Sequence, residues 1–228
     1  MKGMKMQSVS CRAILLYLVG VSLILGITGA AFATPTGLNN IPTADAVSKD
    51  LLVLQGFSEF GGERSPGWFV GAKYGPLENV EIGIDDKAAG SGTAAGPVLQ
   101  GKFRLPLREN CAAALGAANI SDNSDRNGHS FPYFVLSHDL GEMNAHLGYS
   151  WQKANQAWFV GVDRAVTPRL TLRADWTEVE DGDESLASLG FIREIDAQWL
   201  VEAWASFPTA HGEHTAYVAK FDYVVPLK

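Results

Sequence analysis

The sequence predicts an all-β protein: a transmembrane, antiparallel, up-and-down β-barrel of twelve strands, preceded by a short N-terminal segment that is not a strand. Three observations predict this fold. The chain opens with an apolar leader, continues as short segments in which apolar and polar residues alternate, and joins those segments alternately by tight turns and longer polar loops. Strands of this kind have one apolar and one polar face, as the wall of a membrane barrel requires.

Residues 1–33 have the composition of a secretory signal peptide. Basic residues precede an apolar stretch over about 13–27, and Ala31-Phe32-Ala33 provides the small-x-small pattern of a cleavage site. We expect the mature chain to begin at Thr34. An uncleaved anchor is the alternative, but the apolar stretch is shorter than the roughly 18 to 20 residues of a spanning helix.

The mature chain is acidic. Removing the three basic residues of the leader changes the formal charge from −7 to −10, which disfavours nucleic acid as a partner. The mature chain keeps one cysteine, Cys111, so a zinc site built on several cysteines is excluded. No later apolar run is long enough to span a bilayer as a helix, which leaves closed strands as the way to cross one.

Residues 34–50 lack alternation and contain two prolines, so we do not expect them to join a sheet. They either fold into the lumen as a plug or extend into the periplasm. In this segment Pro35-Thr36-Gly37-Leu38, followed by Ile41-Pro42-Thr43-Ala44, resembles the N-terminal segment of certain poorly characterised bacterial outer-membrane barrel proteins, some of them linked to exopolysaccharide export. The resemblance implies an outer-membrane location and assigns a function to no residue.

The barrel domain covers residues 51–228, and its strands are read from an alternation of period two. Over 99–105 the odd-numbered residues are apolar or glycine and the even-numbered ones are polar, and a similar split recurs over 170–177 and 217–224. A helical period fits none of these stretches. We expect strands over 51–60, 68–75, 79–86, 96–106, 111–119, 131–138, 143–151, 157–165, 169–178, 185–193, 196–206 and 215–225.

The connections between these strands are of two kinds. Tight turns are expected at 75–78, 107–110, 139–142, 165–168 and 194–195. Longer polar connections are expected at 61–67, 87–95, 120–130, 152–156, 179–184 and 208–214. This alternation is typical of barrels with tight turns on the periplasmic side and longer loops outside, which places both termini in the periplasm.

The aromatic residues favour a membrane barrel over a water-soluble one, whose strands would alternate in the same way. Trp68 and Tyr74, for example, bracket Val70 and Ala72. Rings at strand ends are typical of the aromatic girdles at two membrane interfaces. The expected interface aromatics are Trp68, Tyr74, Trp151, Trp176, Trp199, Tyr217 and Tyr223.

If the apolar rows face lipid, the polar rows line the lumen. Opposite charges fall on neighbouring strands, as Glu81 and Lys102 do. They either line an open, selective pore or pair with one another and close it. Lys102, Arg104, Arg173 and Lys220 could also form a basic stripe for an anionic solute such as an acidic sugar. The expected pore-lining residues are Lys73, Glu81, Lys102, Arg104, Asp163, Arg173, Asp175, Glu202, Lys220 and Asp222.

Candidate catalytic and metal-binding patterns are weak. Gly128-His129-Ser130 places a serine beside a histidine without a third group, and His211-Gly212-Glu213-His214 lacks the helical frame of a zinc protease motif. The acidic run over 178–184 does not match a calcium loop. His138 and His146 flank a turn and are expected to cap or line the barrel. We expect no catalytic residue, no metal and no cofactor.

Together these features predict a monomeric, porin-like channel for small hydrophilic solutes in the outer membrane of a Gram-negative-type bacterium. Its expected partners are outer-membrane lipids, lipopolysaccharide and, during biogenesis, the barrel-assembly machinery. The alternative is a closed barrel with a structural, adhesive or export-accessory role and no conductance. A lipid-modifying enzyme is the least favoured hypothesis.

Overall fold

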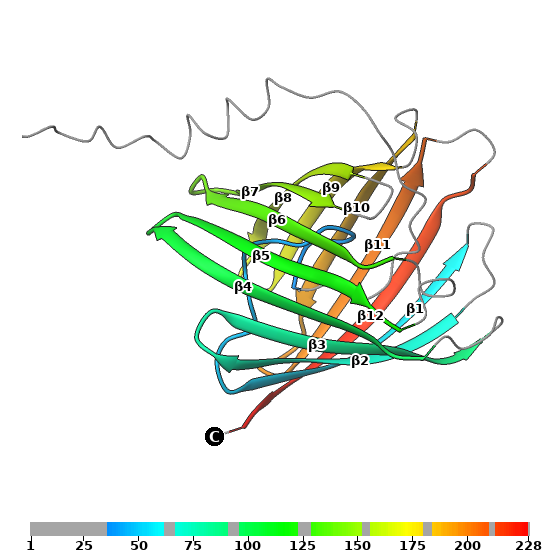
Figure 1. Cartoon of the computed structure of the whole chain (residues 1–228), viewed down its shortest axis with the longest axis horizontal. Coiled ribbons are helices and arrows are strands. Elements are labelled where there is room, and N and C mark those ends of the chain that lie inside the picture. The colour runs from blue at the N-terminus through cyan, green and yellow to red at the C-terminus, as the bar shows by residue number, and fades with distance from the viewer. Residues whose placement is uncertain are drawn as a thin grey trace, which may run out of the picture.

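The computed structural model describes residues 36–61, 67–90, 96–122, 129–151, 156–179, 184–209 and 213–227. Within these ranges the chain forms a closed barrel of twelve antiparallel strands, in which each strand pairs with its neighbours in the sequence and β1 pairs with β12 (Figure 1). The predicted fold is confirmed. The strands are β1 (Leu51–Gly61), β2 (Gly67–Leu77), β3 (Val80–Gly90), β4 (Val98–Arg108), β5 (Cys111–Ile120), β6 (Phe131–Asp139), β7 (Asn144–Trp151), β8 (Gln156–Thr167), β9 (Leu170–Val179), β10 (Glu184–Glu194), β11 (Trp199–Pro208) and β12 (Ala216–Pro226).

Each strand overlaps its predicted range, and the largest differences lie at β3 and β11. Strand β3 continues to Gly90 instead of ending at residue 86, and β11 begins at Trp199 instead of residue 196. The turn expected at 194–195 is therefore longer, because the side chain of Asp196 accepts hydrogen bonds from the backbone N–H of Gln198 at 2.8 Å and of Trp199 at 2.9 Å. These two N–H groups hold the pKa of Asp196 below its ordinary value.

The two faces of the wall have the polarity expected of a membrane barrel. Leu189 on the outer face is 61 % exposed, whereas Glu81 on the inner face is 1 % exposed. A water-soluble protein has the reverse order, with charges outside and large apolar side chains inside. A continuous belt of exposed apolar side chains on this scale marks a surface that meets another apolar phase.

The expected interface aromatics all lie in the outward rows of their strands, near the two ends of the barrel. Trp199 and Tyr223 form one contact between adjacent strands, with ring centroids 4.7 Å apart. Trp68, Trp151, Trp176 and Tyr217 lie toward the loop end, whereas Tyr74, Trp199 and Tyr223 lie toward the turn end.

Several predicted features lie outside the described residues: the leader over 1–33, the loop glycine of the Gly128 motif, His211 with Gly212, and residues 180–183 of the acidic run. In the described part of the chain no helix is long and apolar enough to cross a membrane.

Residues 36–47, hereafter the plug, lie inside the barrel, where Figure 1 draws them in blue. The plug begins as a small hairpin closed by hydrogen bonds from Leu38 N to Ile41 O at 3.0 Å and from Thr43 N to Thr36 O at 3.2 Å. Residues 48–50 then tether it to strand β2, where Asp50 N donates to Gly75 O at 2.8 Å. The described residues 36–47 of the N-terminal segment therefore lie in the lumen.

Candidate functional site

The lumen has an apolar sector, in which the plug packs its hydrocarbon side chains. Leu38, Ile41 and Ala44 of the plug are 6 %, 2 % and 0 % exposed and form one buried cluster with the inner face of the wall. Burying a leucine or isoleucine side chain contributes about 1.5–3 kcal/mol. The wall side of this cluster consists of Ala112, Ala114 and Ala118 of β5, Tyr133 and Val135 of β6, and Phe159 of β8.

Small residues in the wall make room for this packing. Strand β5 contributes alanines to the cluster, and Gly161 of β8 has no side chain where Leu38 approaches. A Cβ atom on Gly161 would overlap Leu38 Cδ1 and stand 2.8 Å from Ile41 Cδ1. The plug therefore fits this sector because the wall lacks bulk there.

Glu81 of β3 and Lys102 of β4 hold both ends of the hairpin. The Glu81 carboxylate accepts hydrogen bonds from Thr36 N at 2.9 Å, Thr36 Oγ1 at 2.6 Å and Val47 N at 2.9 Å. The Lys102 ammonium donates to Thr36 O at 2.7 Å and to Thr43 O at 3.3 Å, and it lies 3.9 Å from Glu81. Both side chains are buried. Hydrogen bonds to charged groups contribute about 1.5–3 kcal/mol each, roughly twice the neutral value.

Arg173 and Asp175 of β9 hold the tip of the hairpin from the other side of the barrel. Arg173 Nη1 donates to Gly37 O and Leu38 O, both at 3.1 Å. Asp175 Oδ2 accepts the backbone N–H of Asn39 at 2.9 Å and of Asn40 at 3.3 Å. The backbone groups of the tip are therefore satisfied by ionised side chains of the wall, where a strand would use a sheet neighbour.

Asn40 reaches the opposite sector, formed by β10 and β11. Its side-chain nitrogen donates to Ser206 Oγ at 2.9 Å and also to Ser188 Oγ, and its side-chain oxygen accepts from Trp204 Nε1 at 3.3 Å. The plug is thus in contact with strands on several sides of the lumen.

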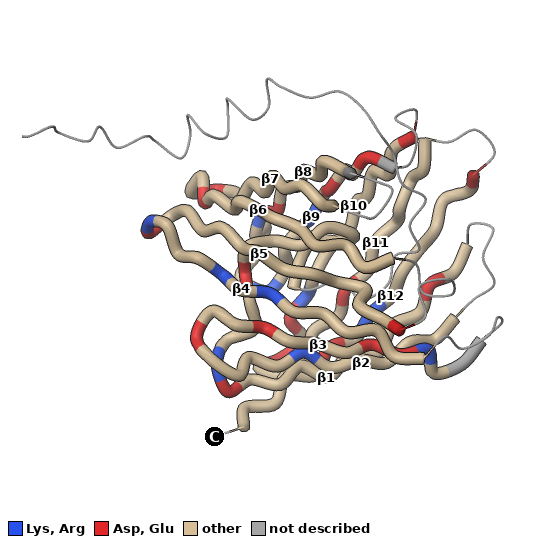
Figure 2. The backbone as a smooth tube through the Cα atoms, viewed as in Figure 1, with Lys and Arg blue, Asp and Glu red and all other residues tan. Residues whose placement is uncertain are grey.

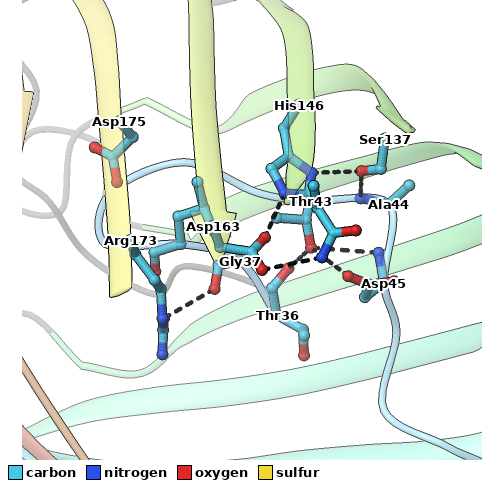
Figure 3. Close-up of polar contacts among 12 residues, drawn as sticks. Thr36, Gly37, Thr43, Ala44, Asp45, Ser137, His146, Asp163, Arg173 and Asp175 are labelled. Atoms are coloured by element: carbon cyan, nitrogen blue, oxygen red, sulfur yellow. Dashed lines mark hydrogen bonds and ion pairs between the residues drawn. The ribbon is translucent and has the colours of Figure 1, made fainter. Parts of the chain in front are cut away.

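Three further side chains form a buried chain of hydrogen bonds that ends on the plug (Figure 3). Ser137 Oγ lies 2.7 Å from His146 Nδ1, and His146 Nε2 lies 2.8 Å from Asp163 Oδ1. Ser137 Oγ also accepts the backbone N–H of Ala44 at 2.8 Å. The residue types are those of a hydrolase triad. However, Ser137 lies in β6 between its two partner strands β5 and β7, so sheet pairing uses the backbone N–H groups that an oxyanion hole would need. We interpret this chain as a support for the plug.

A compact charge cluster lies beside the plug. Glu202 of β11 pairs with Arg173 at 2.7 Å and with Lys220 at 3.1 Å, and Lys220 also lies 3.3 Å from Asp222. All four side chains have little solvent exposure. Figure 2 shows that charged positions occur in the middle of the strands as well as at their ends.

All ten expected pore-lining residues lie in the inward rows of their strands, but they differ in whether they contact the plug. Glu81, Lys102, Arg173 and Asp175 contact the plug directly. Glu202, Lys220, Asp222 and Asp163 act on one another or on His146.

The remaining two residues are Arg104 and Lys73. Arg104 donates to Asn79 Oδ1 at 3.2 Å, at a tight turn. Lys73 is buried on β2. Glu81 and Lys102, the pair expected between neighbouring strands, lie 3.9 Å apart. In the register of β2 with β3, Lys73 is opposite Gly83 and is therefore offset from Glu81.

The sequence reading missed the apolar sector of the lumen. Strand β5 has alanine in both of its rows at 112–114, and β6 alternates Tyr133 and Val135 with Phe134 and Leu136. Because neither row is polar over these residues, the alternation does not indicate which face of the strand points into the lumen. His138, expected to cap the barrel, contacts Asn110 O through Nδ1 at 2.8 Å, near a turn. In the described residues no group of three or more His, Cys, Asp and Glu is placed to hold a metal ion.

Comparison with known proteins supports the fold. No protein-family model matches the chain, and no curated protein matches its sequence. Among solved structures the chain is similar to the KdgM porin, with a TM-score of 0.62 and 10 % identity over 75 % of this chain and 98 % of that one. The NanC porin gives a TM-score of 0.59 and 12 % identity over 75 % and 98 %. An outer-membrane channel from Pseudomonas putida F1 gives 0.57 and 10 % over 85 % and 100 %.

Proposed function

We propose that this chain is an outer-membrane channel for small water-soluble solutes, and that its own N-terminal segment closes it at rest. The location rests on the inverted polarity of the wall, with charged residues inside and large apolar residues outside. The leader over 1–33 would direct export, and the mature barrel would contact membrane lipids and lipopolysaccharide. Insertion would use the barrel-assembly machinery, and the aromatic residues at the strand ends would lie at the two interfaces.

One observation carries the channel assignment: a separate segment occupies the lumen and contacts several strands, where a scaffold barrel would use side chains of its own wall. The plug is bound through its backbone by Glu81, Lys102, Arg173 and Asp175. If the plug withdraws, these ionised groups face an emptied passage. A twelve-stranded barrel is intermediate between small filled barrels and the open sixteen-stranded porins, so a single loop is enough to decide its state.

A closed scaffold is the second candidate, and the number of contacts that hold the plug favours it. The two functions differ in conductance. We expect the folded mature chain in a planar bilayer to give brief stepwise openings, and a Gly161→Val variant to open for longer, because its side chain occupies the space of Leu38. A Gly56→Ala variant is the control, since no atom lies within 4 Å of its added Cβ. Silence from all three folded proteins would support the scaffold.

Location can be tested separately by fractionating cell envelopes. The mature protein should be recovered with the outer membrane, with Thr34 as its first residue. Recovery of the folded protein in the aqueous periplasmic fraction would contradict both the location and the outward orientation of the apolar rows.

A further inference from the structure

We propose that the solute of this channel is a small amphipathic carboxylate, with a short branched hydrocarbon body and one anionic group. This inference rests on the channel function proposed above and goes beyond it by naming a solute class. Its basis is the site on the inner wall to which the plug binds, hereafter the seat. The two halves of the seat differ in chemistry.

The hydrocarbon half is the apolar sector of the wall. Tyr133 and Val135 are 1 % and 0 % exposed while Leu38 and Ile41 cover them. Once the plug leaves, this surface would face water, and a solute with an aliphatic body would cover it again. A sugar or another solute covered with hydroxyl groups would leave the surface without a hydrocarbon partner. The lumen therefore differs from a uniformly polar pore.

The polar half contains two cations that bind oxygen atoms of the plug, beside the carboxylates of Glu81 and Asp175, which accept N–H groups of the plug. Lys102 donates to Thr36 O at 2.7 Å. Arg173 donates to Gly37 O and Leu38 O, both at 3.1 Å, and Figure 3 shows the contact with Gly37. These acceptors are neutral carbonyl oxygens. A carboxylate would supply two charged acceptors in their place, and charge-assisted hydrogen bonds are stronger than neutral ones.

Leu38 by itself joins the two halves. Its isobutyl side chain lies in the apolar cluster, and its carbonyl oxygen accepts from Arg173 Nη1. The hydrocarbon skeleton of leucine without its amino group is 4-methylpentanoate, whose carboxylate and isobutyl group match these two contacts. This anion is therefore the simplest probe of the proposed seat.

Two substitutions distinguish a variant that only releases the plug from one that also fills the seat. Asp175→Ala removes the acceptor for two backbone N–H groups of the plug and leaves the wall side of the apolar cluster unchanged. Gly161→Val also prevents the plug from seating, but its side chain fills the space of Leu38. Both variants should therefore open the channel, and only Asp175→Ala should leave the seat empty.

The experiment is equilibrium dialysis of labelled 4-methylpentanoate against the mature chain in lipid nanodiscs, with empty nanodiscs subtracted. We expect saturable binding to the mature chain, and a half-saturating concentration at least about tenfold lower for Asp175→Ala, since the plug loses the charged acceptor of two N–H groups. Gly161→Val should lose saturable binding, and Gly56→Ala should bind as the mature chain does. Gluconate has the same charge and carbon number but many hydroxyl groups, and it should not bind saturably.

Conductance of the same preparations distinguishes the two proposals. If Asp175→Ala and Gly161→Val conduct potassium chloride but neither binds 4-methylpentanoate, the solute class is wrong and the channel stands. Equal binding of gluconate, or undiminished binding to Gly161→Val, would also overturn the solute class. If no folded variant conducts, the channel itself is wrong.

Discussion

Asp175 Oδ2 accepts the backbone N–H of Asn39 at 2.9 Å, joining two residues 136 positions apart in the chain. Through this contact a carboxylate of strand β9 binds the tip of a segment that precedes the first strand. The binding of the plug therefore depends on individual side chains of the wall, and each of them can be substituted without changing the sequence of the plug.

Asp175→Ala should weaken the seating of the plug by about 1.5–3 kcal/mol, because two N–H groups lose a charged acceptor. We expect residues 36–47 to become sensitive to added protease while the barrel stays intact, as mass spectrometry of the fragments would show. Asp86→Ala is the control, since Asp86 is exposed and its carboxylate accepts from the neighbouring Lys87 N–H. Equal protection of the plug in both variants would show that Asp175 does not retain it.

Gly161→Val should release the plug through a steric conflict with Leu38 and Ile41. Overpacking of this kind costs about 1–3 kcal/mol, a cost the plug can avoid by leaving while the strands stay paired. The emission of Trp204, obtained as the difference from Trp204→Phe, should shift, because Trp204 donates to Asn40. Gly56→Ala should leave that emission unchanged. An unshifted spectrum in Gly161→Val would mean that the plug tolerates the added bulk.

Glu202→Gln should destabilise the barrel itself. Glu202 is the shared partner of Arg173 and Lys220, and removal of one member of a buried charge network costs about 3–5 kcal/mol. Urea unfolding in phospholipid vesicles would measure the loss. The matched control is Glu142→Gln, whose ion pair with Arg164 at 2.9 Å is exposed and should contribute about 0–1 kcal/mol. A loss of similar size in both variants would contradict the role given to this network.

Leu189→Arg should disrupt insertion in proportion to membrane depth. Leu189 lies near the middle of β10 and is 61 % exposed, so an arginine there should cost about 2–4 kcal/mol of folding free energy in a bilayer. Leu107→Arg, near the turn end of β4, should cost about 0–1 kcal/mol. Folding titrations in vesicles would compare them, and the reverse order would contradict the placement of the membrane.

The strands and their facing could be predicted from the sequence because the period-two rows of most strands contrast a polar with an apolar face. Strands β5 and β6 show the limit of this approach: their rows are apolar on both faces, so the apolar seat could not be distinguished from lipid-facing wall. The destination of the plug could not be decided either, because its partners lie up to 166 positions away in the chain. The sequence indicated that charged residues point inward, but it did not indicate that they would bind the backbone atoms of the plug.

Residues 48–50 keep the plug covalently joined to strand β1 after it leaves its seat, and the contact of Asp50 with Gly75 holds that short connection at the barrel end. Because this linker is short, the plug has an effective concentration at its binding site of the order of millimolar. A solute that binds in the barrel must compete with the plug. Transport would therefore begin only at a high external concentration of that solute, and the plug would rebind when the concentration falls.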